Sequence, residues 1–270
     1  MTRVRRVLTC MGLCAALAAV PLTAQAIEAD LGALESLASR SDTSPIPLGL
    51  LVGGTVISYS ARYPAVTDTR IALPGFIYLG ERLFFMGDRA RYYFWRDGPM
   101  AAFAYGRLRM GNLDPADAAS LQGLHKRKWE FEAGVGGNLV TPYGLFTVRA
   151  SSDVTGRSKG QDVSVSVDFP LLFDRVLVMP TLALSWRSSK LSNYYFGGVS
   201  AEEATPTRPA WDTGATLAPV AALAVSWRIN PYWVAALVAA YEHYDRAVAN
   251  SPLVGHSGEA TLVLALGSRW

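Results

Sequence analysis

Three histidines are the side chains of this chain best suited to proton transfer or metal binding, and they lie far apart in the sequence. They are His125, His243 and His256. Two histidines that bind one metal from a helix face stand about four residues apart, and no pair here does. No glycine-rich loop leads from an expected strand into a helix, so nucleotide binding has no support either. We therefore predict no metal site and no cofactor.

A serine nucleophile needs a histidine and an acid that converge on it. Ser251, His243 and Glu242 are close together in the sequence. Glu242 and His243 are adjacent in a segment with strand character, however, and neighbouring strand residues point to opposite faces. We therefore predict no catalytic residues and expect that the protein is not an enzyme.

The first 26 residues have the pattern of a cleaved secretory signal. A basic start, an apolar run and a small-x-small cleavage pattern follow one another: Arg3, Arg5 and Arg6; Val7 to Leu22; Ala24-Gln25-Ala26. Both cysteines, Cys10 and Cys14, lie in this segment. Cleavage near Ala26 would therefore leave no cysteine for a disulfide or a thiolate metal site.

The charge balance gives no reason to expect a nucleic-acid partner. The chain has 25 Lys and Arg against 22 Asp and Glu, and the predicted signal holds three of the arginines and no acid. The remainder is balanced and has no basic patch.

Hydropathy and periodicity favour a membrane β-barrel. Half of the residues are hydrophobic and the mean hydropathy is +0.18, yet after residue 26 no run approaches the ~20 apolar residues of a membrane helix. The apolar residues alternate with polar ones instead, as where Val163, Val165, Val167 and Phe169 alternate with Asp162, Ser164, Ser166 and Asp168. This period of two is that of a strand, and a barrel strand shows lipid only every second side chain.

We predict an all-β fold, an antiparallel transmembrane β-barrel of about 12 strands within a range of about 10–14. The expected strands are 48–60, 70–79, 82–87, 89–96, 99–110, 128–140, 143–154, 161–173, 175–187, 213–228, 231–245 and 258–270, so the barrel domain is 47–270. Their connections alternate between one- or two-residue turns and mostly long loops, which is the outer-membrane pattern. Aromatic residues near strand ends, including Tyr92, Tyr93, Trp129, Trp227 and Tyr244, predict girdles at the two membrane interfaces.

The polar face of the predicted strands carries charges that would point into the lumen. These residues are Glu130, Glu132, Arg149, Asp153, Asp162, Asp168 and Arg187. Inward charges are normal in membrane barrels and can pair with one another; they can also select ions in a channel. A 12-strand barrel lies between small filled barrels and wide porins, so we expect a narrow or plugged lumen.

The two ends of the expected domain differ in character. The last strand places Leu262, Leu264, Leu266 and the terminal Trp270 on one face, which has the form of a C-terminal assembly signal read by the barrel assembly machinery. Residues 27–46 precede the barrel and have helical spacing of apolar residues. They could form a short helix that plugs the barrel mouth, and we favour a loose lead-in because chain termini are often unpinned.

Several loop motifs resemble the MltA-interacting protein/OmpV family. Residues 193–204, NYYFGGVSAEEA, resemble the family's YFGVS segment with one extra glycine; residues 208–215, RPAWDTGA, resemble its LPAYDAGAG stretch. Residues 249–254, ANSPLV, resemble its ADSPLV loop, and the region from Tyr63 to Phe85 resembles its early segment with a thinned acidic cluster. The resemblance covers essentially the whole chain after the predicted signal.

This resemblance implies a barrel in the outer membrane of a Gram-negative bacterium, in contact with its lipid. It also implies an envelope scaffold that holds a lytic transglycosylase beside a bifunctional penicillin-binding protein. A narrow passive channel for small solutes is the alternative, and the residues alone do not choose between the two.

Overall fold

The computed structural model describes residues 37–41, 44–63, 69–111 and 113–270. Its strands are β1 (Gly49–Tyr59), β2 (Thr69–Leu79), β3 (Leu83–Met86), β4 (Arg89–Asp97), β5 (Met100–Arg109), β6 (Glu130–Thr141), β7 (Gly144–Asp153), β8 (Gln161–Asp168), β9 (Leu171–Phe173), β10 (Val176–Arg187), β11 (Thr216–Arg228), β12 (Trp233–His243) and β13 (Gly258–Arg269). The loops contain the short helical segments η3 (Ala119–Leu121), α2 (Ser189–Tyr195) and α3 (Arg246–Ala249). Within these described ranges no helix is long and apolar enough to cross a membrane.

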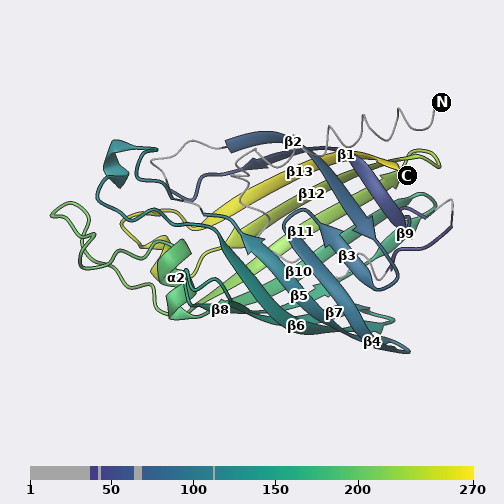
Figure 1. Cartoon of the computed structure of the whole chain (residues 1–270), viewed down its shortest axis with the longest axis horizontal. Helices are drawn as coiled ribbons and strands as arrows, with labels where there is room; N and C mark the ends of the chain where they lie inside the picture. Colours follow the sequence, from purple (N-terminus) through teal and green to yellow (C-terminus); the bar gives the residue numbers. More distant parts are fainter. Residues whose placement is uncertain (1–36, 42–43, 64–68, 112) are drawn as a thin grey trace, which may run out of the picture.

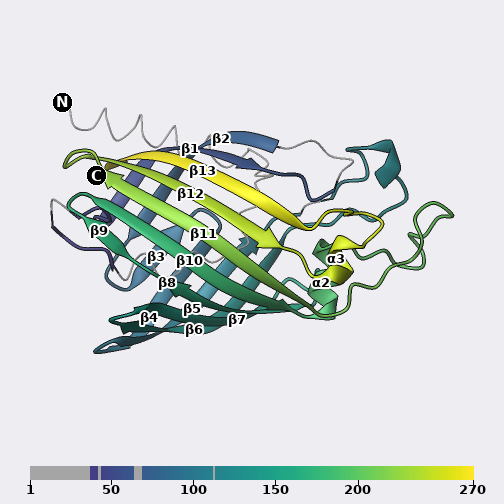
Figure 2. The same ribbon diagram turned by 180° about the vertical axis from the view of Figure 1, so that it is seen from behind.

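The strands close into one antiparallel barrel, seen from both sides in Figures 1 and 2. β13 pairs with β1 over Leu51–Tyr59 and so joins the two ends of the sheet. β8 and β9 pair with β10 in one continuous register, so they are two parts of a single barrel strand interrupted at Phe169 and Pro170. The 13 segments therefore make a 12-strand barrel, which confirms the fold class predicted from the sequence.

The alternation of side chains sorts the wall into an outer apolar face and an inner face. On β8 the outward Val165 is 52% exposed, whereas the neighbouring inward Ser166 is 7% exposed. On β13 the outward residues Leu262, Leu264 and Leu266 are all exposed. An exposed apolar band of this kind is stable only against lipid, because in water it would be an aggregation surface.

The two ends of the barrel carry different connections. Tight turns join β2 to β3, β4 to β5, β6 to β7, β9 to β10 and β11 to β12. Long loops dominate the opposite end: 60–68, 110–129, 154–160, 188–215 and 244–257. Short turns face the periplasm and long loops face outward in outer-membrane barrels, so the end that carries α2 in Figure 1 is the extracellular end.

Two residues of the expected aromatic girdles lie elsewhere. Tyr93 is 1% exposed inside the barrel, where its ring contacts Phe103 with the ring centroids 5.4 Å apart. Its neighbour Tyr92 does face outward, and adjacent strand residues cannot share a face. Tyr244 is buried among the extracellular loops. Trp129 and Trp227, by contrast, are exposed near strand ends.

The described part of the lead-in packs against the barrel interior, unlike the loose segment that the sequence favours. Residues Ser44–Pro47 are buried. Ser226 Oγ donates to Pro45 O at 2.7 Å, and Arg228 Nη1 donates to Ser44 O at 3.3 Å. Ile46 joins a hydrophobic cluster, here named the floor cluster, with Leu51, Leu79, Phe84, Leu177, Met179, Ala224 and Val234. The physical reason is that the apolar side chains of the floor cluster come together at the periplasmic end from several strands, which the local periodicity of residues 27–46 does not reveal. Residues 27–36 of the lead-in and the predicted signal lie outside the described residues.

Candidate functional site

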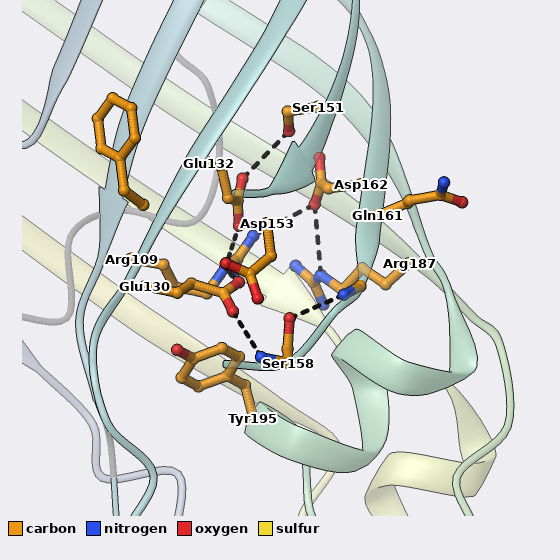
Figure 3. A network of polar contacts seen from close by, with 12 residues as sticks. Arg109, Glu130, Glu132, Ser151, Asp153, Ser158, Gln161, Asp162, Arg187 and Tyr195 are labelled. Carbon is orange, nitrogen blue, oxygen red and sulfur yellow. Dashed lines mark hydrogen bonds and ion pairs between the residues drawn. The ribbon is translucent and has the colours of Figure 1, made fainter. Parts of the chain in front are cut away.

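A layer of charged side chains crosses the lumen beneath the extracellular loops (Figure 3). This lumen layer consists of Arg109, Glu130, Glu132, Arg149, Asp162, Arg187 and Glu242. All of them face inward, and all except Arg149, which is midway along β7, lie at or near the extracellular ends of their strands. Arg149 reaches the same level through its contact with Asp162. None is more than 6% exposed.

Arg109 is the centre of the layer. Its Nε lies 2.5 Å from Glu132 Oε1 and 3.7 Å from Glu130 Oε1, and its Nη2 lies 3.5 Å from Asp162 Oδ2. Arg149 Nη2 reaches Asp162 Oδ1 at 2.9 Å. Burying a charge is costly unless it is paired and hydrogen-bonded, so these side chains stabilise one another's burial.

Neutral donors complete the coordination of the carboxylates. Ser151 Oγ donates to Glu132 Oε2 at 3.1 Å, and the backbone N–H of Ser158 donates to Glu130 Oε2 at 3.1 Å. Figure 3 shows Ser151 of β7 and Ser158 of the loop between β7 and β8 approaching the two glutamates. The layer is therefore held by neutral hydrogen bonds as well as by ion pairs.

Phe196, which directly follows α2, lies between the lumen layer and the loops. Its ring is fully buried, with the guanidinium carbon of Arg187 at 3.9 Å and that of Arg62 at 4.3 Å from the ring centroid. Arg62 also donates to Glu259 Oε2 at 2.8 Å and to Tyr195 O at 3.2 Å. Cation–π contacts strengthen when water is excluded, so the two arginines hold this ring in the mouth of the barrel.

A sharp turn after Phe196 keeps the segment inside the mouth. Gly197 has φ +93°, and a Cβ at this position would lie 2.8 Å from Ser251 Oγ. Ser251 Oγ donates to Gly197 O at 2.5 Å. A residue with a side chain would be strained here both by its backbone and by the contact.

Above Phe196 the extracellular loops share a hydrophobic core, here named the mouth cluster. Its buried members are Tyr63, Leu113, Leu121, Leu124, Leu191, Tyr195, Phe196, Val199, Tyr244, Val248, Leu253 and Val254. They come from four different loops and the helical segments within them. Loops that bury this much apolar surface hold one another in place and cover the lumen layer.

Glu203 ties two of these loops together by its carboxylate. It accepts from Arg127 Nη2 at 3.0 Å, from His125 N at 2.7 Å and from Ser200 N at 3.0 Å. Burial opposes its ionisation, but these donors outweigh burial and lower the pKa of Glu203 to about 2. The carboxylate is therefore ionised at neutral pH and holds the loop 110–129 against the loop 188–215; the extracellular loops of the mouth cluster together are here named the extracellular cap.

The structure brings most of the sequence-predicted lumen residues together and leaves two apart. Glu130, Glu132, Arg149, Asp162 and Arg187 lie in the lumen layer. Asp168 is buried lower in the barrel, where Thr181 Oγ1 donates to it at 2.6 Å. Asp153 instead accepts from its own loop, including Thr155 N at 2.8 Å and Lys159 N at 2.9 Å.

Several other members of the site were not singled out from the sequence, and only some of them could have been found there. Arg109 lies near the end of the expected strand 99–110 on its inward face, so the alternation of that strand could have identified it. Glu242 is likewise inward on its strand. Arg62, Phe196 and Glu259 depend on how loops fold over the mouth, and no period encodes that.

No catalytic arrangement forms among the residues considered for one. Glu242 is inside the barrel with Arg187, while His243 is exposed on the outer side. Ser251 is buried against Gly197. Across the part of the chain that the structure describes, no group of three or more His, Cys, Asp or Glu side chains is placed to hold a metal ion.

A closed antiparallel barrel with a lipid-facing apolar wall and a charged interior defines an outer-membrane β-barrel protein. The chain belongs to the family described as MltA-interacting protein MipA, which it matches over residues 52–270.

Relatives with similar sequences are also outer-membrane proteins. The chain is 28% identical to outer membrane protein Omp26La of Vibrio anguillarum over 52% of this chain and 54% of that protein. It is 26% identical to outer membrane protein OmpV of Vibrio cholerae over 54% of this chain and 56% of that protein. The chain thus spans about half the length of these relatives.

Among solved structures, the barrel is similar to the NanC porin, with a TM-score of 0.43, 9% identity, and coverage of 81% of this chain and 100% of that one. It is also similar to OmpT of Vibrio cholerae, with a TM-score of 0.38, 10% identity, and coverage of 82% and 97%. Likenesses this distant carry no argument about function.

Proposed function

We propose that this barrel is an interaction scaffold of the cell envelope that is closed to free diffusion. In this proposal its periplasmic end holds a lytic transglycosylase, with a bifunctional penicillin-binding protein as a second partner. The family's description as an MltA-interacting protein supports the first partner. The second partner rests on the family resemblance alone.

The observation that carries the closed state is the burial of the lumen layer and of Phe196. Glu130 and Phe196 are 0% exposed, and Arg62, Arg109 and Arg187 are at most 2% exposed. Side chains that water cannot reach cannot line a water-filled pore. A barrel without a water-filled pore cannot act by passing solutes. Binding partner proteins at a rigid periplasmic rim requires no passage of solutes through the barrel.

The test is site-specific photocrosslinking in envelope membranes. Tyr143 lies in the periplasmic turn between β6 and β7 and is 83% exposed. We expect a photoreactive side chain at Tyr143 to capture a lytic transglycosylase, identified by mass spectrometry. The matched control is Thr207, which is exposed in an extracellular loop.

Capture from Tyr143 and not from Thr207 supports the scaffold. If periplasmic positions, including Tyr232 in the turn between β11 and β12, capture no murein enzyme in membranes where that enzyme is abundant, the scaffold proposal is wrong.

The second candidate is a narrow passive channel for small solutes. The observation that favours it is the ring of charges in the lumen layer, since such rings set ion preference in open pores. This candidate requires the mouth cluster to move aside. Its test is solute-driven swelling of vesicles that contain the purified barrel, with empty vesicles as the control.

A further inference from the structure

The barrel wall does not reach the extracellular end at β3, because this strand has only four residues. β2 pairs with β1 along its full length, Thr69–Leu79, but with β3 only over Ile77–Leu79 (Figure 1). Among the described residues, no strand lies beside Thr69–Phe76 on the side away from β1. Among the residues that the structure describes, the extracellular half of β2 therefore has an unpaired side, here named the open edge.

The backbone groups on this open edge can be assigned from the ladder. Gly80 N donates to Leu83 O across the β2–β3 pair, and alternate residues of a strand direct their backbone groups to the same side. The even-numbered residues Arg70, Ala72, Pro74 and Phe76 therefore face the opening. Pro74 has no N–H, so it interrupts the edge and opposes the addition of another strand.

The inner wall behind the opening is mainly apolar, although Thr55 and Thr261 also face the lumen there. Ile57 of β1, Ile71 and Leu73 of β2 and Val263 of β13 alternate with outward residues, so they face the lumen, and they are partly exposed. In the described residues none of them belongs to the mouth cluster or to the floor cluster. The buried charges of the lumen are concentrated on β4 to β8, and Arg187 on β10 and Glu242 on β12 join them.

An apolar wall inside a barrel is unfavourable against water and favourable against a hydrocarbon chain. The mouth cluster lies at the extracellular end of the lumen and the floor cluster at the periplasmic end. The open edge of β2 borders the outward face of the barrel, which is in contact with the hydrocarbon of the outer leaflet. The unpaired edge of β2 therefore offers a lateral route to the apolar wall.

We propose that the open edge of β2 is a lateral entrance through which a single-chain anionic amphiphile, such as a fatty acid, places its chain against Ile57, Ile71 and Leu73. An anionic head group would accept hydrogen bonds from the edge N–H groups of Arg70 and Ala72. The guanidinium of Arg70, which is exposed at the extracellular end of β2, adds a charge-assisted contact.

The test uses a fluorophore attached to a single cysteine, in a full chain whose Cys10 and Cys14 are replaced by serine. Leu73→Cys reports the inner wall beside the opening. Ala222→Cys on β11 is the matched inward control far from it, and Val56→Cys is the outward control in lipid. The quencher is a doxyl-labelled stearic acid titrated into phospholipid vesicles that contain the folded barrel.

We expect saturable quenching at Leu73→Cys, little quenching at Ala222→Cys and non-saturating quenching at Val56→Cys. Quenching at Leu73→Cys no greater than at Ala222→Cys would overturn the entrance. Equal quenching at Leu73→Cys by a doxyl-labelled two-chain phospholipid would overturn the single-chain ligand, because bulk lipid would then fill the wall.

Arg70→Gln tests the head-group contact. It should weaken the saturable quenching about two- to fivefold, the range for an exposed ion pair. The control Arg157→Gln, an exposed arginine in the loop between β7 and β8, should leave the quenching unchanged. Equal effects of the two substitutions would overturn the role of Arg70.

Discussion

Arg187 and Glu242 meet inside the barrel across an intervening strand, with nitrogen–oxygen contacts of 2.7 and 2.8 Å. They lie on β10 and β12, and β11 separates these two strands in the sheet. Both side chains are buried. A bidentate arginine–carboxylate pair fixes orientation as well as distance, so this pair sets the level at which Phe196 rests on Arg187.

Removing one partner of this pair should destabilise the barrel strongly. We expect Glu242→Leu to lower the free energy of unfolding by about 3–5 kcal/mol, because it removes the bidentate carboxylate partner of the buried Arg187 charge. The measurement is urea unfolding in vesicles, followed by heat-modifiable gel mobility. The double variant Arg187→Met, Glu242→Leu should regain most of the loss, and a single variant as stable as the wild type would show that the pair does not hold the layer.

The extracellular cap should weaken in strong acid because of Glu203. Its pKa of about 2 in the folded protein lies below the ordinary value for glutamate, so the ionised group stabilises the folded cap. That contribution is complete above the ordinary glutamate pKa and is lost as the pH falls through about 2. We expect the thermal midpoint of Glu203→Gln to fall less than that of the wild type when the pH is lowered from about 5 to about 2. Parallel pH profiles would argue against this role.

Adjacent residues of β1 should respond differently to the same charge. Val56 faces outward and is 45% exposed, whereas Thr55 faces the lumen. An arginine at mid-bilayer costs about 2–4 kcal/mol on the lipid face, so Val56→Arg should reduce the folded fraction in membranes more than Thr55→Arg does. Equal folded fractions at matched expression would mean that the outer and inner faces are assigned wrongly.

The C-terminal residue should matter for assembly by its ring and by its backbone. Trp270 N donates to Leu50 O at 3.0 Å, and the ring is 77% exposed. We expect deletion of Trp270 to slow insertion by the barrel assembly machinery, because it removes an interfacial aromatic ring and a hydrogen bond of the closing strand pair. Trp270→Phe, which keeps both features, is the control. A deletion variant that folds as fast as the wild type would contradict this prediction.

The sequence predicts the barrel well because period two is a local property. Each strand reveals its faces on its own, so the positions of Glu132, Asp162 and Val165 follow without knowledge of their neighbours. The sequence predicts the short β3 as a strand at 82–87, because turns flank it on both sides. It does not predict the interruption of the eighth barrel strand at Phe169 and Pro170, because the alternation continues through it.

The site is less predictable because it depends on contacts between distant segments. Arg62 meets Glu259 across 197 positions of sequence, and Phe196 enters the mouth only because Gly197 turns the chain. Ser44 and Ile46 are buried for a similar reason, since the floor cluster assembles from strands that are far apart in the chain. The local spacing of residues does not predict contacts between segments that are far apart in the sequence.

In the proposed scaffold, the lumen layer and Phe196 close the barrel to free diffusion. Electrical recording of the purified wild-type barrel in a planar lipid bilayer tests it directly. We predict that inserted protein, verified by its heat-modifiable mobility after recovery, produces no stable conductance steps. Reproducible, ohmic conductance steps from the wild-type protein would contradict the closed barrel and favour the channel.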